Sequence, residues 1–562
     1  MTKKLSEFVD SIKSSGYAFV SSDGKTQIAA SDVEISSLAF DSRDVKPGSL
    51  FFALPGTHTT GNIFIPNAIK AGAGAVVFQD DFDEKTQAEI SKAVQENAAP
   101  VFIKVPGARF AMAPMAASFY DEPSKKLGVI GVTGTEGKSS TVSFVWQLLR
   151  LCGHKSGFIS TVQYSLGDEA QANPQHTTTP EAPIIQKYLY EMVQNGCEYA
   201  VVESSSHGLS PKLNRTGNLC FDCGIFMNVT LEHLEFHGTF EQYREDKANL
   251  FRKLDEHDHK KTILGKSVTV PSFGIVNLED PSATYFINAT KQPVLGFTTE
   301  GKAGKAAAEG TQAPLLPPIP DEIPVLLGRN IAAARFGLTF DMSEPNLIDE
   351  NSKPVRKLIH VKAPVPGAFN AYNLMAAICA VSRLTNTPLE EVAKQAEKLE
   401  SVKGRMTVID EGQPFELIVD YAHTPSSFET IFPPIRRRCS GKMIALFGSG
   451  GERDLKKRPL QGAIAAKFCD VVILADEDPR QEDPVELLKM IAVGAEKEGK
   501  VLGKDLFITP DRPAAIRQAF KMAGKGDIVL LLGKAHENSI IYKDGPHPYD
   551  EISEAKKALK EI

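Results

Sequence analysis

The residues with the clearest chemical potential lie in one glycine-containing segment that follows an apolar run. It reads Gly134-Thr135-Glu136-Gly137-Lys138-Ser139-Ser140. Glycines let backbone N–H groups turn toward phosphate oxygens, and the N-terminus of a following helix adds positive potential. Lys138 can then reach the β- and γ-phosphates of a nucleotide, and the Ser139 hydroxyl can bind Mg²⁺. A tight strand–helix turn with an exposed lysine needs neither two glycines nor two hydroxyls after the lysine. The segment therefore predicts a phosphate-binding loop in the short G-x-x-G-K-S form.

The elements that must position this loop recur along the chain. Short β-branched runs that end near glycine and precede amphipathic stretches occupy 127–134, 199–208, 443–451, 470–475 and 527–533. Near-continuous apolar strands of this kind are buried on both faces, as in a parallel sheet covered by helices. Ligands bind at the carboxyl ends of such strands. The pattern predicts an α/β fold.

Length and composition narrow the class of protein. A chain of 562 residues is too long for one ordinary core and predicts three or four domains. The 63 basic and 70 acidic residues leave a net charge of −7, which argues against a nucleic-acid partner and a polybasic membrane surface. No apolar run approaches the roughly 18 residues of a membrane span, and the N-terminal stretch lacks a signal-peptide core. We therefore expect a cytoplasmic protein without membrane insertion.

The cysteines and the linkers give weaker signals. Seven irregularly spaced cysteines indicate reduced thiols rather than a disulfide framework. Cys220-x2-Cys223 could suggest zinc, but no second Cys/His pair follows at ligand spacing, so two buried thiols on a strand are the better interpretation. A strand and a helix in 99–126 end in the turn signal DEPS, and 301–325 is a Gly-, Ala- and Pro-rich loop or insertion.

The phosphate loop resembles that of the Mur ligases, ATP-dependent amide-bond ligases of peptidoglycan synthesis, in which GTNGKTT or GTNGKSS is usual. Glu136 stands where that family usually has Asn, and a carboxylate beside a triphosphate is unfavourable unless Mg²⁺ or Arg offsets it. The resemblance covers nearly the whole chain. It is nearest to the MurE branch, the UDP-N-acetylmuramyl-tripeptide synthetases. It implies three α/β domains: 1–125 for the UDP substrate, 126–401 for ATP in a P-loop-type parallel sheet, and a Rossmann-like 402–562 for the amino acid.

The N-terminal segment 39–77 is similar to the uridine-nucleotide domain of that branch. The resemblance places Ser42 and Arg43 beside the UDP group, although an ordinary surface turn would explain them alone. In the central domain, HTTTPEAP and VVESSSHGL resemble motifs that contact the nucleotide-dipeptide substrate. The residues that these two motifs and the following segment contribute are Thr178, Thr179, Ser205, Ser206, His207 and Arg215.

The third central motif, 226–251, is similar to the family's metal-binding segment. The resemblance makes His233 and Lys247 parts of a second Mg²⁺ site, with Lys247 carbamylated by CO₂, while Glu203 and Ser139 serve the nucleotide's Mg²⁺. A carbamate offers an anionic oxygen on a long stem, whereas a bare ammonium would repel the metal. Without the family, Lys247 would be an exposed helical lysine. The implied catalytic residues are Lys138, Glu203, His233 and Lys247.

Further family motifs surround the nucleotide and the incoming amino acid. Those implied for ATP, besides the loop, are Asn277, Asp280, Asn370, Asn373, Arg405, Asp420, Tyr421 and His423. Those implied for the amino acid are Arg453, Glu477, Asp478, Arg480, Gly533 and Glu537. Asp478 replaces the Asn of the family's DNPR motif and favours lysine or ornithine. Arg480 favours meso-diaminopimelate, unless it pairs with Glu482 or Asp483. The balance leans slightly toward lysine or ornithine.

The resemblance implies acyl-phosphate chemistry. The D-glutamate carboxylate of UDP-N-acetylmuramoyl-L-alanyl-D-glutamate attacks the γ-phosphate of ATP, and the amine of a diamino acid then displaces phosphate. We expect a monomer with small-molecule partners only. A polyglutamate-type ligase is a related alternative, opposed by the segment 39–77. A nucleotide-dependent switch is an alternative of another class, opposed by the second metal site.

Overall fold

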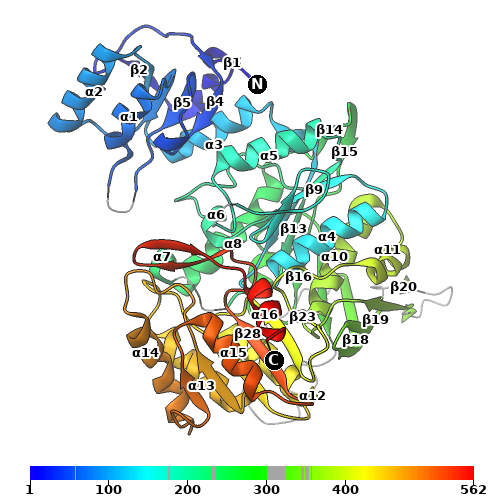
Figure 1. Ribbon diagram of the computed structural model, residues 1–562. Helices are drawn as coiled ribbons and strands as arrows, with labels where there is room; N and C mark the ends of the chain where they lie inside the picture. The colour runs from blue at the N-terminus through cyan, green and yellow to red at the C-terminus, as the bar shows by residue number, and fades with distance from the viewer. Residues whose placement is uncertain are drawn as a thin grey trace.

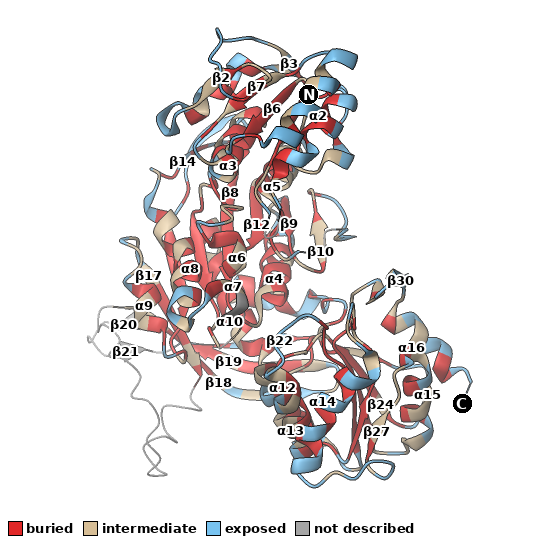
Figure 2. Ribbon diagram, turned by 90° about the vertical axis from the view of Figure 1, so that its left-hand side faces the viewer, coloured by how far each residue is buried: buried red, intermediate tan, exposed pale blue. Residues whose placement is uncertain are grey.

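The computed structural model describes residues 1–56, 59–174, 177–230, 232, 234–299, 323–343, 347–348, 354–355 and 357–561. Most of the predicted insertion 301–325, and His233, lie outside these residues. In the described part of the chain, three large sheets follow one another in sequence, each covered by helices (Figure 1). Their central strands are buried and the outer helix faces are exposed (Figure 2), so each sheet forms the centre of its own core. The predicted α/β class is confirmed.

The N-terminal sheet has the order β2-β7-β6-β5-β4. Strands β4 to β7 are parallel, and β2 pairs with β7 in the antiparallel sense. The strands are β2 (Ala18–Val20), β4 (Ser37–Ala39), β5 (Ser49–Phe52), β6 (Ala75–Phe78) and β7 (Val101–Lys104). The helices are α1 (Ile65–Lys70), α2 (Glu84–Glu96) and α3 (Ala108–Phe119). The predicted turn DEPS follows α3 and leads through left-handed Asp121 and Glu122 into the central domain.

The central sheet has eleven strands in the order β11-β10-β9-β12-β8-β13-β16-β17-β18-β19-β22. Its middle, from β9 to β18, is parallel as predicted, whereas both edges are antiparallel. The parallel strands are β8 (Gly128–Thr133), β9 (Ser156–Ile159), β12 (Tyr199–Glu203), β13 (Cys223–Phe226), β16 (Phe273–Asn277), β17 (Val294–Thr299) and β18 (Val325–Ala334). The edge strands are β10 (Gln163–Ser165), β11 (Gln171–Ala172), β19 (Gly337–Ser343) and β22 (Leu358–Ala363). Strand β22 alternates exposed and buried residues, which antiparallel edges tolerate because one face can meet water.

Helices cover both faces of the central sheet. Ile130 and Val132 of β8 point into a core shared with α4 (Lys138–Leu151) and α10 (Asn370–Thr385). Val129, one residue out of phase, points into the opposite core, which α5 (Ala182–Gln194) and α8 (Phe240–Arg252) complete. Shorter helices are α6 (Ser206–Leu209), α7 (Leu234–His237), α9 (Ala283–Ile287) and α11 (Leu389–Gln395).

The third sheet has the order β23-β24-β28-β25-β26-β27, parallel except for β23. Its strands are β23 (Thr407–Ile409), β24 (Glu416–Asp420), β25 (Met443–Phe447), β26 (Val471–Leu474), β27 (Leu506–Ile508) and β28 (Ile528–Leu532). Its helices are α12 (Pro425–Arg438), α13 (Lys457–Phe468), α14 (Pro484–Lys497), α15 (Arg512–Met522) and α16 (Glu551–Leu559). Two hairpins matter below: β14 (Lys260–Ile263) with β15 (Lys266–Thr269), and β29 (Ser539–Tyr542) with β30 (Gly545–Pro548). Among the described helices, none is both long and apolar enough to cross a membrane.

Candidate functional site

The predicted phosphate loop joins the end of β8 to the start of α4, at the carboxyl edge of the central sheet. Gly137 has a φ of +83°, and a Cβ at this position would lie 2.6 Å from Asn373 Oδ1, so only glycine fits. The Thr135 N–H donates to the carbonyl of Asn228 at 2.9 Å, which fixes the loop against the end of β13. The strand–loop–helix context that phosphate binding requires is present.

A hydroxyl and a carboxylate meet beside the loop. Ser139 Oγ donates to Oε1 of Glu203, at the end of β12, over 3.1 Å. Thr161, which sequence reasoning missed, donates to the same carboxylate from its backbone N–H at 2.8 Å and its hydroxyl at 3.0 Å. Oxygen donors of these two types suit Mg²⁺, so Ser139 and Glu203 fit the ion expected here.

Lys247 is buried, with only 1% of its surface exposed, so the alternative of an exposed helical lysine is wrong. Its Nζ donates to the carbonyl of Gly134 in the phosphate loop at 2.7 Å. Burial lowers the pKa of Lys247 well below its usual value, and Lys138 nearby lowers it further. A lowered pKa favours the neutral amine, which is the form of lysine that reacts with CO₂. The predicted partner His233 lies outside the described residues.

Three residues predicted for the UDP-dipeptide substrate come together next to Glu203. Thr179 Oγ1 donates to the Glu203 carbonyl at 2.8 Å and accepts the Ser205 N–H at 2.9 Å. Arg215 donates to the Thr179 carbonyl at 3.1 Å, and its Nε bonds with Glu181 at 3.1 Å. Because Arg215 is held in this way, its guanidinium is positioned at the edge of the substrate motifs.

The remaining predicted substrate residues are placed less uniformly. Ser206 is buried and its Oγ lies 3.0 Å from His237 Nε2, while the His207 ring packs 4.2 Å from that of Phe236. Thr178 precedes Thr179 and is half-buried. In the first domain, Ser42 starts a short 3₁₀ turn and the Arg43 side chain, 87% exposed, pairs with Asp41. The polar contacts described for Arg43 are with Asp41. The structure therefore does not connect Arg43 with Thr179, Ser205 and Arg215.

A cavity of about 510 Å³ lies between the central and third domains. Ten residues predicted for ATP line it: Thr135, Gly137, Lys138, Ser139, Ser140, Asn277, Asp280, Asn373, Arg405 and Asp420. Sequence reasoning missed several lining residues, among them Phe369, Tyr372 and Ser426. Tyr372 lies between Asn370 and Asn373 on α10, and this position within the predicted GxFNxxN motif was the available signal.

Four residues predicted for ATP do not line the cavity: Gly134, Asn370, Tyr421 and His423. Asn370 is buried behind Asn373 and accepts its side-chain N–H at 2.8 Å. Gly134 presents its carbonyl to Lys247. Burial lowers the pKa of His423 to about 4, so it is neutral at pH 7, with Nδ1 2.9 Å from the Tyr421 carbonyl.

Arg405 connects the phosphate loop to the third domain. Its Nη2 donates to Ser139 Oγ at 3.3 Å, and its Cζ lies 4.9 Å from the centre of the Tyr421 ring. The Tyr421 hydroxyl in turn donates to Glu537 Oε1 at 3.2 Å. Asp420 accepts two backbone N–H groups at 2.7 Å each, while burial raises its pKa and Arg405 opposes that rise. A continuous set of contacts therefore runs from the phosphate loop to the predicted amino-acid pocket.

That pocket is acidic, and Lys534 lies among its carboxylates. The Lys534 ammonium, which sequence reasoning passed over within LLGKAHEN, bonds with Asp478 at 2.8 Å and also with Glu537. Glu477 Oε2 is buried and makes no hydrogen bond with the described residues. Burial raises the pKa of Glu477, and Lys457 opposes the rise. Gly533 has a φ of +94°, and a Cβ there would lie 2.8 Å from Glu477 Oε2, so glycine makes room for this carboxylate.

Arg480 is not held by the neighbours that the sequence offered. Glu482 pairs with Arg458 instead, at 2.7 and 2.8 Å, and Asp483 caps α14 by accepting the Glu486 N–H. Arg480 has a φ of +56°, a conformation that costs energy for a side chain of this size, and its Nε is buried without a hydrogen-bond partner in the described chain. It lines a second cavity of about 860 Å³ beside the β29–β30 hairpin.

Arg453, also predicted for the amino acid, is exposed on the turn before α13. It is near Gly450, where a Cβ would lie 3.3 Å from Arg453 Cγ. The structure therefore does not bring its side chain into the acidic pocket.

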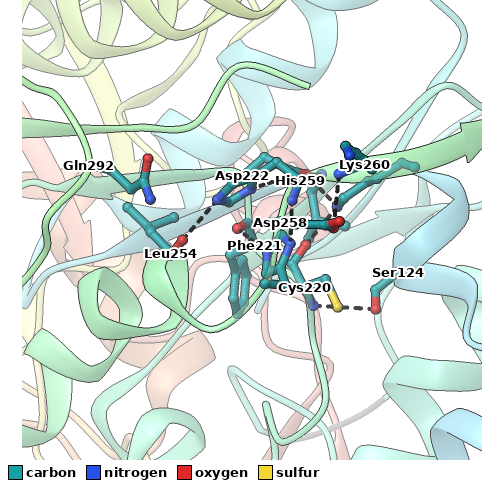
Figure 3. Close-up of polar contacts among 12 residues, drawn as sticks. Ser124, Cys220, Phe221, Asp222, Leu254, Asp258, His259, Lys260 and Gln292 are labelled. Atoms are coloured by element: carbon teal, nitrogen blue, oxygen red, sulfur yellow. Dashed lines mark hydrogen bonds and ion pairs between the residues drawn. The ribbon is translucent and has the colours of Figure 1, made fainter. Parts of the chain in front are cut away.

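A different group of possible metal ligands lies at the opposite, amino edge of the central sheet (Figure 3). Asp222 is fully buried: one oxygen lies 2.9 Å from His259 Nδ1, and the other accepts the Val129 N–H at 2.8 Å and the Lys261 ammonium. His259 Nε2 lies 2.8 Å from the Leu254 carbonyl. Both ring nitrogens of His259 therefore lie at hydrogen-bond distance from an oxygen acceptor.

The third member of the group is engaged as well. His257 places Nε2 2.8 Å from the Phe221 carbonyl and accepts the His259 N–H at Nδ1. With the carboxylate and the imidazole nitrogens already paired, the group is a buried ion-pair network and not a metal centre. The adjacent cysteines follow the prediction in part: Cys223 is buried at the start of β13, whereas Cys220 is half-buried before the strand.

Comparison with known proteins places this geometry in a family. Three family models match the chain in order: "Mur ligase family, catalytic domain" over 34–120, "Mur ligase middle domain" over 132–381 and "Mur ligase, glutamate ligase domain" over 404–535. A UDP-N-acetylmuramyl-tripeptide synthetase of Treponema denticola is 50% identical over 93% of this chain and 94% of its own length. A UDP-N-acetylmuramoyl-L-alanyl-D-glutamate–2,6-diaminopimelate ligase of Geobacillus kaustophilus is 34% identical over 94% and 95%.

The fold agrees with these sequence matches. A solved structure of a UDP-N-acetylmuramoyl-L-alanyl-D-glutamate–2,6-diaminopimelate ligase superimposes with a TM-score of 0.56 at 24% identity, over 94% of this chain and 95% of that one. Full-length identity of 50% with a named synthetase, together with the three ordered domain matches, is decisive. The chain therefore belongs to the Mur ligase family of ATP-dependent, amide-bond-forming ligases.

Proposed function

We propose that this ligase adds a diamino acid to the D-glutamate of UDP-N-acetylmuramoyl-L-alanyl-D-glutamate in peptidoglycan synthesis. The contacts from Ser139 through Arg405 and Tyr421 to Glu537 carry the proposal, because they join a phosphate loop to an acidic pocket across one domain boundary. An amide ligase needs this arrangement, since the phosphorylated carboxylate and the incoming amine must meet. The tripeptide synthetase at 50% identity supports the choice of substrate.

The chemistry follows from the charges at the loop. The D-glutamate carboxylate attacks the γ-phosphorus of ATP, ADP leaves, and an acyl phosphate forms. Lys138 and Arg405 offset the charge of the two approaching anions, an electrostatic contribution that needs no protein nucleophile. The neutral amine of the diamino acid then attacks the acyl carbon, phosphate leaves and the nitrogen loses a proton. The third domain, seated over the cavity, excludes the water that would hydrolyse the acyl phosphate.

Two Mg²⁺ ions and a modified lysine complete the proposed site. Ser139 and Glu203 would hold one ion, and Lys247, as its carbamate, would hold the other together with His233. Mg²⁺ at these places supplies positive charge to the phosphate oxygens. The lowered pKa of the buried Lys247 supports the modification, because only the neutral amine adds to CO₂.

Thr178, Thr179, Ser205, Ser206, His207 and Arg215 make up the proposed contact surface for the dipeptide end of the UDP substrate. The hydrogen bonds of Thr179 with the Glu203 backbone carbonyl and with Ser205 support this, because they place the group beside the metal-binding carboxylate. Ser42 and Arg43 are proposed for the uridine diphosphate end, in the range that matches the first family model.

We propose lysine or ornithine as the added amino acid. Glu477 supports this, since its buried Oε2 is free to accept from a side-chain ammonium. Asp478 and Glu537 both accept hydrogen bonds from Lys534, whereas Oε2 of Glu477 has no hydrogen-bond partner among the described residues. The alternative is meso-diaminopimelate, favoured by the unpartnered Nε of Arg480, which can bind a carboxylate.

One assay tests the reaction and the amino acid together. The purified protein is incubated with MgATP, the UDP-dipeptide and L-lysine, L-ornithine or meso-diaminopimelate, and phosphate and tripeptide are quantified. We expect phosphate release to require both acceptor and amino acid, which a nucleotide switch would not. Preference for meso-diaminopimelate would overturn the choice of lysine or ornithine, and turnover with glutamate and a polyglutamate acceptor would overturn the proposed reaction.

Two substitutions sharpen the assignment. E477Q should raise KM for lysine and ornithine about tenfold, because a charge-assisted hydrogen bond becomes a neutral one. R480A, in the neighbouring cavity, is the comparison variant and should leave those KM values within threefold. A larger rise in KM for the amino acid with R480A than with E477Q would favour meso-diaminopimelate.

A further inference from the structure

Glu136 is the residue of the phosphate loop that departs from the family's Asn, and the proposed reaction gives it no task. It lines the cavity between the central and third domains. Its backbone is clamped by one side chain: its N–H donates to Asn228 Oδ1 at 2.8 Å, and its carbonyl accepts from Asn228 Nδ2 at 3.2 Å. With the backbone held on both sides, the direction of the Glu136 side chain is set by the loop.

That side chain reaches across the domain boundary. Glu136 Oε1 accepts the hydroxyl of Thr424 at 3.3 Å, and these two residues are 288 positions apart. Thr424 is the N-cap of α12, since its Oγ1 also accepts the Ser427 N–H at 3.1 Å. A carboxylate near a helix N-terminus is stabilised by the unpaired backbone N–H groups and the helix dipole.

The charges around Glu136 come from both domains. Lys138 of the loop and Arg405 of the third domain are the cations, and Glu232 and Asp420 are the anions. Burial raises the pKa of Glu136 to about 7, which shows that these cations do not offset the loss of water completely. The Thr424 hydroxyl and the start of α12 are therefore, with Arg405, third-domain groups that favour the carboxylate when the domains meet.

We propose that Glu136 is a positioning residue that ties the phosphate loop to the N-terminus of α12, so that nucleotide binding and seating of the third domain reinforce each other. Asn, one methylene shorter, would not span the 3.3 Å contact from the same backbone, which accounts for the departure from the family residue. The inference rests on the proposed binding of nucleotide phosphates at this loop.

The test separates reach from charge. E136Q keeps an acceptor oxygen at the same reach, and T424S keeps the hydroxyl; both should bind MgADP within twofold of wild type. E136N and E136A lose the contact and should bind MgADP about fivefold to tenfold more weakly, as loss of one hydrogen bond implies. T424V should do the same. It also loses the helix cap, so the pair needs a double-mutant cycle.

In the cycle, the double variant E136A/T424V should bind MgADP no more weakly than whichever single variant binds it more weakly, because both substitutions remove the same contact. Kinetically, E136N should raise KM for ATP more than it lowers kcat, with no fall in the melting temperature. Three results would overturn the proposal. The losses of MgADP affinity could multiply in the double variant, E136Q could bind MgADP as weakly as E136A, or all variants could bind it within twofold of wild type. If E136A or T424V fails to fold, the comparison of E136N with E136Q decides by itself.

The MgADP measurement also distinguishes this inference from the proposed function. A wild-type protein that binds MgADP but forms no tripeptide refutes the proposed reaction, while the coupling between Glu136 and Thr424 is still measured. A wild-type protein that does not bind MgADP overturns both.

Discussion

Replacing Asp222 by Asn removes the central charge of the buried network in Figure 3. The side chain is fully buried and faces Lys261, His259 and the Val129 N–H. Asn would leave the Lys261 ammonium without its counter-charge in a place where only 3% of that residue is exposed. Breaking a buried ion pair on one side costs about 3–5 kcal/mol. At about 2–4 °C per kcal/mol for a large domain, the central domain of D222N should melt roughly 6–20 °C lower.

Thermal unfolding and hydrogen exchange measure this loss. The amide of Val129 reports the network directly, because its N–H donates to Asp222, and its exchange should accelerate in D222N. D168N is the matched control: Asp168 is 77% exposed and lies 3.7 Å from Lys155, and an exposed pair contributes little. Replacing the pair together, as D222L with K261M, should recover part of the lost stability because no lysine ammonium is left without its carboxylate.

Two results would refute the reasoning. A D222N protein that melts within 1 °C of wild type, with unchanged exchange at Val129, would show that the network does not stabilise the central domain. Stoichiometric zinc in the wild-type protein that is lost in both D222N and an H257A variant would show that the group is a metal centre.

Three further predictions concern the site. K247A should lose turnover and regain part of it with added formate, measured as phosphate release, and full activity without formate would remove Lys247 from the site. The pKa of Glu136 is about 7 in the fold, against an ordinary 4.5. The folded state therefore holds the proton that the unfolded chain releases, which costs no stability below pH 4.5 and increasingly more as the pH rises to 7. E136Q should therefore melt higher than wild type at pH 8 but not at pH 4, and an equal difference at both pH values would contradict this. G533A would place a Cβ 2.8 Å from Glu477 Oε2, so KM for the amino acid should rise about tenfold while KM for ATP stays within twofold, and the reverse pattern would be evidence against the acidic pocket.

The phosphate loop shows what local sequence can predict. Strand β8, the glycine at 137 and helix α4 follow from a pattern confined to about twenty residues, and the structure has them where the pattern placed them. The reason is physical: backbone direction in a strand–loop–helix unit depends on glycine and on local hydrogen bonds. Lys247 is the opposite case. Its own segment predicts an exposed helix face, and only the packing of α8 against the central sheet buries it.

Hydrogen bonds between residues far apart in the chain could not be predicted from the sequence. Arg405 and Ser139 are 266 positions apart, and Glu136 and Thr424 are 288 apart, so no spacing rule connects them. The partner of Glu482 illustrates the same limit at shorter range. Neighbouring Arg480 was the candidate, but Arg458, on α13, reaches the carboxylate because α13 packs against α14.

The central claim is that one cavity couples phosphoryl transfer to amide formation, and isotope transfer tests it most directly. The UDP-dipeptide is prepared with ¹⁸O in the D-glutamate carboxylate that reacts, and incubated with the protein, MgATP and the diamino acid. An acyl phosphate carries one carboxylate oxygen into the phosphate that the amine displaces, so the account predicts one ¹⁸O per phosphate released, in step with tripeptide formed. Phosphate without ¹⁸O, or released at the same rate when the diamino acid is absent, would contradict it.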